Sequence, residues 1–287
     1  AARRGHAVTL WEASDRLGGQ FELASLVPGK EDYAATVRAA RAELAERGAT
    51  VHLGRAVTVD DLAGSDAVVV AAGVVPRGID VPGASLPHVV SYERALREGV
   101  PAGSVAIIGG GGIGVDTAAF LVESPDEASR AAEFGRRWDV DVSDEVVGDV
   151  PQRIPVADRV LRPGHQVTVL RRSGKFGTGI GITSRWVAIG RLRDAGVRMV
   201  GGVQEYLRIE PGALWIRDED GVERAVPADT VVVCAGQERR SGADELVEGL
   251  RSAGTPCEVV GGARDARSVD AVRATSEALE AVRRLAP

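Results

Sequence analysis

The chain has 287 residues, of which 41 are acidic and 35 basic, so its formal net charge at pH 7 is −6. This length suffices for one large domain or two ordinary ones with buried apolar cores. The mild acidity argues against nucleic acid as a partner, and no apolar run of about 18 residues predicts a membrane span. With only Cys234 and Cys257, the chain excludes a disulfide framework, a Cys-x-x-Cys redox centre and a four-cysteine iron–sulfur cluster of its own.

Elements that favour β-structure and helix alternate along the chain, which predicts an α/β fold with a mostly parallel sheet. In the first part we expect strands at residues 7–11, 51–53 and 67–72 and a helix at 32–48. The apolar run 67–72 predicts burial on both faces of its strand. Residues 73–101 are rich in Gly and Pro and contain one helical stretch, at 92–98, so we interpret them as a crossing between domains.

A second unit follows, with a strand at 104–108 and a helix at 113–122. The polar segment 123–163 is interpreted as an insertion. Further along we expect strands at 166–170, 197–200 and 230–235, helices at 184–195 and 269–285, and a hairpin-like region over 204–226 that turns at 218–221. Apolar strands end in Ala72-Gly73 and in Ala235-Gly236, which indicates a weak repeat of two dinucleotide-binding folds.

Glycine is overrepresented, with 36 of 287 residues, and it occurs in clusters without a period. The most informative cluster is Gly109-x-Gly111-x-x-Gly114, which follows an apolar strand and opens a helix, the context that a dinucleotide-binding loop requires. Gly109 allows the tight turn, Gly111 lets a pyrophosphate approach the backbone, and Gly114 allows close packing of the helix, whose N-terminus attracts an anion. Asp116, in the first helical turn, is interpreted as a cap or as a partner of the helix dipole.

Basic residues follow the next strand of this unit. An acid there favours NAD, whereas arginine favours the 2′-phosphate of NADP. The sequence has Arg171, Arg172 and, shortly after, Lys175, with no acid among them. Guanidinium groups match phosphate geometry, so we expect NADP, and the intervening insertion leaves open which arginine makes the contact.

In the first unit an acid, Glu12, follows the strand at 7–11, where a flavin- or NAD-binding fold holds the ribose hydroxyls. Gly18 and Gly19 suit a close approach of ligand to backbone. A first strand and glycine loop are missing before Ala1, so we expect a chain cut inside its first nucleotide-binding domain.

No nucleophile with a matching base is evident, and four scattered histidines (His6, His52, His88 and His165) predict no metal site. Trp186 follows a stretch rich in Gly, Ser and Thr. It is either a core residue or a wall of the nicotinamide pocket.

The stretches AARRGHAVTLWEA, LGGQF, VPGK, AGVVPR, VAIIGGGGIG-x-DTA, VVVCAGQE and VVGG occur in this order. In order and spacing they resemble the C-terminal half of bacterial NADPH-dependent 2,4-dienoyl-CoA reductases, in the old-yellow-enzyme-like family that includes trimethylamine dehydrogenase. The resemblance implies two Rossmann-like domains: an FAD domain at residues 1–100 and 237–287, and an inserted NADPH domain at 101–236. It also implies a cytoplasmic protein whose separate N-terminal barrel carries FMN, the substrate site and a 4Fe-4S cluster.

The resemblance further implies the cofactor contacts. FAD would be contacted by Glu12, Gln20, Lys30, the backbone of Val57, and Gly261 and Gly262, and the NADPH phosphate by Arg171 and Lys175. Gly73 and Gly236, at the ends of the repeated strands, are also expected to border a cofactor. Two departures from the family pattern are the sequence Ile-Thr-Ser-Arg at 182–185, in place of Lys-Thr-Thr-Gly, and Arg264, in place of an Asp.

The expected activity is therefore hydride transfer from NADPH to FAD, with onward transfer through iron–sulfur and FMN to an enoyl-CoA or related enone. The cofactors carry this chemistry, so no catalytic side chain is expected in this chain. Two alternatives remain open at this point. One is a stand-alone NADPH-dependent flavin reductase subunit of the ferredoxin-reductase or glutamate-synthase-small-subunit type, and the other is a non-catalytic dinucleotide-binding module.

Overall fold

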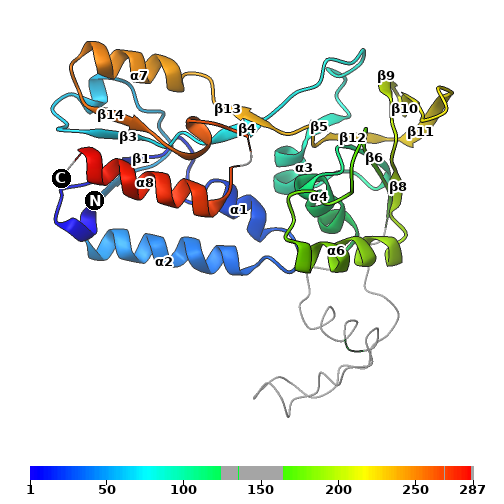
Figure 1. The fold of residues 1–287 in the computed structure, drawn as a ribbon, viewed down its shortest axis with the longest axis horizontal. Coiled ribbons are helices and arrows are strands. Elements are labelled where there is room, and N and C mark those ends of the chain that lie inside the picture. Colours follow the sequence, from blue (N-terminus) through cyan, green and yellow to red (C-terminus); the bar gives the residue numbers. More distant parts are fainter. Residues whose placement is uncertain (124–134, 136–163, 268, 286–287) are drawn as a thin grey trace. The chain divides into compact units, whose positions relative to one another are not determined.

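The computed structural model of the chain describes residues 1–123, 135, 164–267 and 269–285 (Figure 1). The chain divides into two compact units. The first unit contains Ala1–Glu22, Asp32–Arg77 and Gly236–Pro287, and the second contains Leu23–Glu31 and Gly78–Ala235. Apart from Glu123 and residue 135, the predicted insertion lies outside the described residues. No helix in the described ranges is long and apolar enough to cross a membrane.

The second unit is built on a parallel sheet with strand order β5-β12-β6-β7-β8. Its strands are β5 (Val89–Ser91), β6 (Gly103–Ile108), β7 (His165–Leu170), β8 (Arg198–Val200) and β12 (Thr230–Val233). All of β12 and the last four residues of β6 and β7 are buried, which explains why these runs are almost wholly apolar. The register places Ile108 beside Leu170 and Val233, so three strand ends meet at one edge of the sheet.

Two apolar clusters cover the two faces of this sheet. Because side chains alternate along a strand, Val105 and Ile107 pack in the cluster on one face while Ala106 and Ile108 pack in the cluster on the other. The first cluster includes residues of three helices, α3 (Tyr92–Glu98), α4 (Gly112–Val122) and α6 (Ile182–Asp194). The second includes residues of an antiparallel sheet of β9 (Glu205–Glu210), β10 (Gly212–Arg217) and β11 (Glu223–Ala228).

That antiparallel sheet corrects one expectation from the sequence. The region predicted as hairpin-like contains three strands rather than two, because the chain also reverses between β9 and β10, where Gly212 takes the left-handed backbone conformation (φ 84°). The second reversal lies where it was expected. The Asp218 carboxylate fixes it by accepting from the amides of Asp220 (3.0 Å) and Val222 (2.9 Å).

The first unit has three two-stranded sheets. Its strands are β1 (Thr9–Trp11), β2 (Thr50–His52), β3 (Val68–Val70), β4 (Val74–Pro76), β13 (Gln237–Arg239) and β14 (Cys257–Val259), with β1-β2 and β3-β14 parallel and β4-β13 antiparallel. Its helices are α1 (Gln20–Ser25, whose end enters the second unit), α2 (Asp32–Glu46), α7 (Ala243–Ser252) and α8 (Ala271–Leu285). Helix α8 packs against β3, β14 and a short 3-10 turn, Gly261–Ala263.

The expectation that residues 67–72 are buried on both faces is wrong. Val70 is buried with Leu62, Val247 and Leu250, but Val69 is 37% exposed. Side chains alternate along the strand, so Val69 lies on the face opposite Val70, and it belongs to none of the apolar clusters of the described residues.

The unit boundaries also differ from those expected. Residues 78–100 belong to the second unit, because β5 pairs with β12 and α3 packs on α4. Residues 23–31 belong there too, since Leu23 and Val27 are buried in the cluster on the helical face of the five-stranded sheet. Helix α3, by contrast, begins and ends where the sequence predicted. Ser91 caps its N-terminus through the amide of Arg94 (3.2 Å), and Gly99 ends it at φ 75°.

Candidate functional site

The glycine loop, residues 109–114, joins β6 to α4 at the edge where the strand ends meet. A Cβ added to Gly109 would lie 2.2 Å from the carbonyl oxygen of Cys234, and one added to Gly114 would lie 1.8 Å from the carbonyl oxygen of Gly109. These two glycines are therefore required by packing. At Gly111 the nearest atom, the carbonyl oxygen of Thr178, would be 3.6 Å away, so packing does not require glycine there, and the approach of a pyrophosphate to this backbone stays a prediction.

Gly110 is a site residue that the three-glycine motif does not include. A Cβ there would lie 2.6 Å from the ring of Phe176. Its carbonyl oxygen accepts from the amide of Gly177 (2.8 Å) and from Nη1 of Arg171 (2.7 Å). Next to it, the amide of Gly112 donates to the carbonyl of Thr178 (3.0 Å). The unbroken run of four glycines was the only sequence signal for this crowding.

The three predicted phosphate-binding side chains follow β7 but differ in their surroundings. Arg171 is half-buried and donates to the carbonyls of Gly110 and Ser173. Arg172 and Lys175 are exposed. The charge of Arg172 reaches Tyr206 of β9, where it partly offsets the burial that raises the pKa of that phenol to about 12.

Lys30 and Asp116 form an ion pair, with Nζ to Oδ2 at 2.6 Å. The side chains are 35% and 24% exposed. Burial raises the pKa of the Asp116 carboxyl, and the Lys30 ammonium opposes that shift. The predicted capping role of Asp116 is wrong, since the N-cap of α4 is Gly111 with no side-chain bond. The prediction missed the pairing because Lys30 is 86 positions away.

Beneath the glycine loop lies Cys234, which is buried and whose Sγ is 3.7 Å from Oγ1 of Thr117. Burial raises the pKa of this thiol to about 12, so it is not a thiolate at neutral pH.

Trp186, on α6, is 58% exposed, and Ile182 one turn earlier is 80% exposed. Trp186 is therefore not a core residue, and its place beside a nicotinamide ring stays a prediction.

In the first unit, Glu12 directly follows β1. Its Oε1 accepts from the amide and from the hydroxyl of Ser14, both at 2.8 Å. Gly18 and Gly19 both take positive φ, 134° and 51°, and a Cβ on Gly18 would lie 2.5 Å from Cγ of Glu22. This chain of tight turns leads into α1, where Gln20 accepts from Nε2 of Gln237 (3.3 Å).

The remaining predicted cofactor contacts in this unit are Gly73, Gly236, Gly262 and Val57, and the structure places Gly262 beside Gly73. A Cβ on Gly262 would lie 2.5 Å from Cγ1 of Val74 and 3.3 Å from the backbone of Gly73. A Cβ on Gly236 would meet the guanidinium of Arg77 at 2.6 Å. Val57 packs at the edge of the cluster of Leu62, Val70, Val247 and Leu250.

Gly261 is held by a side chain that the sequence did not single out. The buried amide of Gly261 donates to Oε2 of Glu277 on α8 (2.6 Å). Arg264, at the position of the expected Asp, lies 3.8 Å from the same carboxylate, while Asp265 binds Arg267. Thus in the first unit Gly262 lies beside Gly73, and Gln20 bonds to Gln237, the neighbour of Gly236, whereas Lys30 belongs to the second unit.

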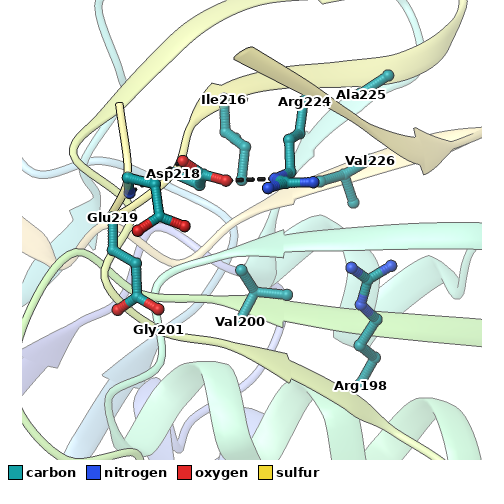
Figure 2. Close-up of a pocket in the computed structure, with 10 residues that line it drawn as sticks. Arg198, Val200, Gly201, Ile216, Asp218, Glu219, Arg224, Ala225 and Val226 are labelled. Carbon is teal, nitrogen blue, oxygen red and sulfur yellow. Dashed lines mark hydrogen bonds and ion pairs between the residues drawn. The ribbon is translucent and has the colours of Figure 1, made fainter. Parts of the chain in front are cut away.

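A separate pocket of about 280 Å³ lies between β8 and the antiparallel sheet (Figure 2). Arg198 and Val200 line it from β8, and Val226 lines it from β11. Figure 2 shows the Asp218–Arg224 ion pair at its rim. It contains none of the predicted cofactor residues. Among the described residues no group of three or more His, Cys, Asp or Glu side chains is placed to hold a metal ion.

The residues around the two glycine clusters have the chemistry that dinucleotide binding requires. The backbone at Gly111, next to a helix N-terminus and a basic strand end, suits a pyrophosphate and a further phosphate. The clustered glycines of the first unit and the carboxylate of Glu12 suit a second nucleotide with free ribose hydroxyls.

Comparison with known proteins agrees with this arrangement. Residues 1–258 match the model of the pyridine nucleotide-disulphide oxidoreductase family. The chain is 28% identical to a metal reductase of Desulforamulus reducens over 98% of this chain and 41% of that protein. It is 36% identical to a bilirubin reductase of Mediterraneibacter gnavus over 43% of this chain and 20% of that protein. The chain thus spans less than half the length of these relatives.

Among solved structures, a 2-naphthoyl-CoA reductase shares the fold with a TM-score of 0.74 and 22% identity, over 96% of this chain and 36% of that one. The histamine dehydrogenase of Rhizobium sp. 4-9 is similar, with a TM-score of 0.73 and 18% identity over all of this chain and 41% of that one. The family match, the glycine loop and the two-unit α/β fold agree. The chain belongs to the pyridine nucleotide-disulphide oxidoreductase family.

Proposed function

We propose that the chain is the electron-input part of a larger flavoenzyme, in which NADPH reduces FAD. Electrons then pass through an iron–sulfur cluster and FMN in a further barrel domain to an enoyl-CoA, a dienoyl-CoA or a related enone. The single observation that supports the NADPH preference is the composition of the loop after β7. It contains Arg171, Arg172 and Lys175 and no acidic residue. A ribose 2′-hydroxyl would call for a carboxylate at that place.

Hydride transfer between nicotinamide and flavin is the chemistry that the bound cofactors supply. The residues of this chain bind and orient them. The backbone around Gly111 takes the pyrophosphate, the basic residues after β7 take the 2′-phosphate, and Glu12 holds the flavin ribose. The first two contacts are charge-assisted, so their strength falls as salt is added.

This chain has no pair of reactive cysteines that could accept electrons from the reduced flavin. The family's name refers to a disulfide, but Cys234 is buried and un-ionised, and Cys257 is the only other cysteine in the sequence. An acceptor outside this chain is therefore part of the proposal. The names of the similar proteins, which are reductases of metal and bilirubin, support reduction as the reaction type.

The test uses the full-length protein that contains this chain, kept free of oxygen. NADPH should bleach the visible flavin absorbance, and an enoyl-CoA thioester added afterwards should restore it. Bleaching without reoxidation by any enone would contradict the proposed acceptor and favour a stand-alone reductase. Failure of NADPH to bleach the flavin would contradict the electron-input role itself.

A further inference from the structure

The two adjacent arginines after β7, Arg171 and Arg172, have different surroundings. The guanidinium of Arg171 is turned toward the protein, with Nη1 2.7 Å from the carbonyl oxygen of Gly110 and Nε bonded to the carbonyl of Ser173. The guanidinium also lies close to Gly174, where a Cβ would be in tight contact with Nη2 at 3.1 Å. Arg172, one residue on, is exposed and forms no ion pair within the described residues.

The backbone of Arg171 is fixed on both sides as well. Its amide donates to the carbonyl of Val200 (2.9 Å), and its carbonyl accepts from the amide of Val203 (3.1 Å). The residue therefore extends the pairing of β7 by one position, and its Cα, from which the side chain projects, is fixed in place. Because the backbone of Arg171 is already fixed, its side chain loses less conformational entropy when it forms hydrogen bonds, and these bonds can hold the acceptor groups in place.

What Arg171 bonds to is the glycine loop. The stretch that we call the basic loop, residues 171–180, meets the glycine loop through three hydrogen bonds. They are Arg171 Nη1 to Gly110 O (2.7 Å), Gly177 N to Gly110 O (2.8 Å) and Gly112 N to Thr178 O (3.0 Å). Phe176 packs over Gly110 from the same side. Four glycines in a row have high conformational freedom, so a loop with this sequence needs such external bonds to keep one shape.

We propose that Arg171 is a positioning residue that fixes the glycine loop for either coenzyme, and that Arg172 with Lys175 distinguishes the 2′-phosphate. This inference rests on the proposed NADPH preference and assigns its parts to individual side chains. Loss of Arg171 removes one of the two donors to the carbonyl of Gly110, the other being the amide of Gly177, and so loosens the pyrophosphate cradle, which NADPH and NADH share. Loss of Arg172 removes a charge that only the phosphorylated nucleotide uses.

The experiment measures binding of 2′,5′-ADP and of 5′-AMP to the full-length protein by calorimetry. The variants are Arg171→Ala, Arg172→Ala and, as a matched control, Arg198→Ala. Arg198 is exposed on the neighbouring strand β8 and lines the pocket of Figure 2, away from the glycine loop. We expect Arg172→Ala to weaken 2′,5′-ADP about tenfold or more and to leave 5′-AMP unchanged, as the loss of a charge-assisted contact predicts.

Arg171→Ala should weaken both nucleotides by the same factor. It should also speed hydrogen exchange at the amide of Gly112, which Thr178 holds, while the rest of the sheet keeps its protection. Arg171→Lys, whose ammonium can still donate to one carbonyl, should recover part of the binding, and it serves as the reporter if the alanine variant does not fold. Arg198→Ala should change none of these quantities.

Selective loss of 2′,5′-ADP binding in Arg171→Ala, with Arg172→Ala unaffected, would overturn this division of roles. So would unchanged binding and exchange in both Arg171 variants. If the unmodified protein binds 2′,5′-ADP no better than 5′-AMP, the proposed NADPH preference is wrong, and the division of roles that rests on it is wrong too. If the unmodified protein does prefer 2′,5′-ADP, the variants test the division of roles by itself.

Discussion

The two units each place glycines at the end of a parallel strand, but they hold them by different means. After β6 the shape of residues 109–114 is imposed by lack of space, since a Cβ at Gly109 or Gly114 would overlap backbone oxygen. After β14 the turn Gly261–Ala263 is held by two side chains as well as by packing. The carboxylate of Glu277 accepts from the amide of Gly261, and Nε of Arg239 donates to the carbonyl of Ala263 (2.6 Å). Gly109 and Gly114 therefore tolerate no added atom, whereas the turn after β14 depends in addition on side chains from other elements, above all on Glu277 of α8.

The difference follows from the sheets. The second unit has five parallel strands with both faces covered, so its loop is surrounded by backbone on several sides. Among the described residues β14 pairs with β3 alone, and α8 packs against both β14 and the turn that follows it. The predictions below test this contrast, beginning with the largest effect.

The largest effect is expected for Gly114→Ala. Its Cβ would lie 1.8 Å from the carbonyl oxygen of Gly109, and neither backbone can move without displacing β6 or α4. We expect a loss of about 3 kcal/mol or more in the free energy of unfolding, measured by urea denaturation. The matched control is Gly111→Ala, where 3.6 Å of space predicts a change within about 0.5 kcal/mol but weaker coenzyme binding. Equal destabilisation by both substitutions would contradict the packing account.

In the first unit, Glu277→Ala should cost about 2 kcal/mol, because the buried amide of Gly261 loses its acceptor. We expect FAD to dissociate more readily from this variant as well. Glu280→Ala is the control on the same helix, since Glu280 is 60% exposed and makes only an i,i+4 pair with Arg284. Its effect should stay below about 0.5 kcal/mol. If Glu280→Ala destabilised the protein as much as Glu277→Ala, the turn would not be held as described.

A smaller effect is expected for the Lys30–Asp116 pair. Because both side chains are only partly exposed, a double-mutant cycle with Lys30→Met and Asp116→Asn should give a coupling of about 1 kcal/mol. The exposed pair Arg94–Glu98 on α3 is the comparison, and its coupling should be under about 0.5 kcal/mol. Strict additivity at Lys30 and Asp116 would show that the ion pair does not form in solution.

The smallest perturbation probes the buried thiol. In the native protein, iodoacetamide at neutral pH should label Cys257 and leave Cys234 untouched, because burial raises the pKa of Cys234 to about 12. In the unfolded chain the thiol ionises near its ordinary pKa of 9.0, so its contribution to stability is complete below that pH. It is lost as the pH rises from there toward 12. Labelling of Cys234 before Cys257, followed by mass spectrometry, would contradict the packing of the second unit.

The sequence predicted well the parts of this fold that depend on local pattern. The strands β6, β7 and β12 are almost wholly apolar, and the glycine loop has a fixed spacing, so all of them lie within a residue or two of where they were expected. It failed where contacts span long distances in the chain. The ion pair of Lys30 with Asp116 and the hydrogen bond of Gly261 with Glu277 form only in the folded chain, and no local sequence pattern predicts them.

Burial was also predicted unevenly, and for a physical reason. An apolar run predicts a strand, but whether both faces are covered depends on neighbouring layers. The same kind of run is fully buried in β12 and leaves Val69 of β3 37% exposed. The two adjacent arginines show the same limit, because residue type alone does not tell which one turns toward Gly110.

The most direct test of the central claim is an anaerobic titration of the flavin in the full-length protein with NADPH and, separately, with NADH. The account predicts that NADPH bleaches the flavin at a concentration at least about tenfold lower than NADH, because the basic residues after β7 contact the additional phosphate. Bleaching by NADH at the same concentration, or no bleaching by either coenzyme, would contradict it.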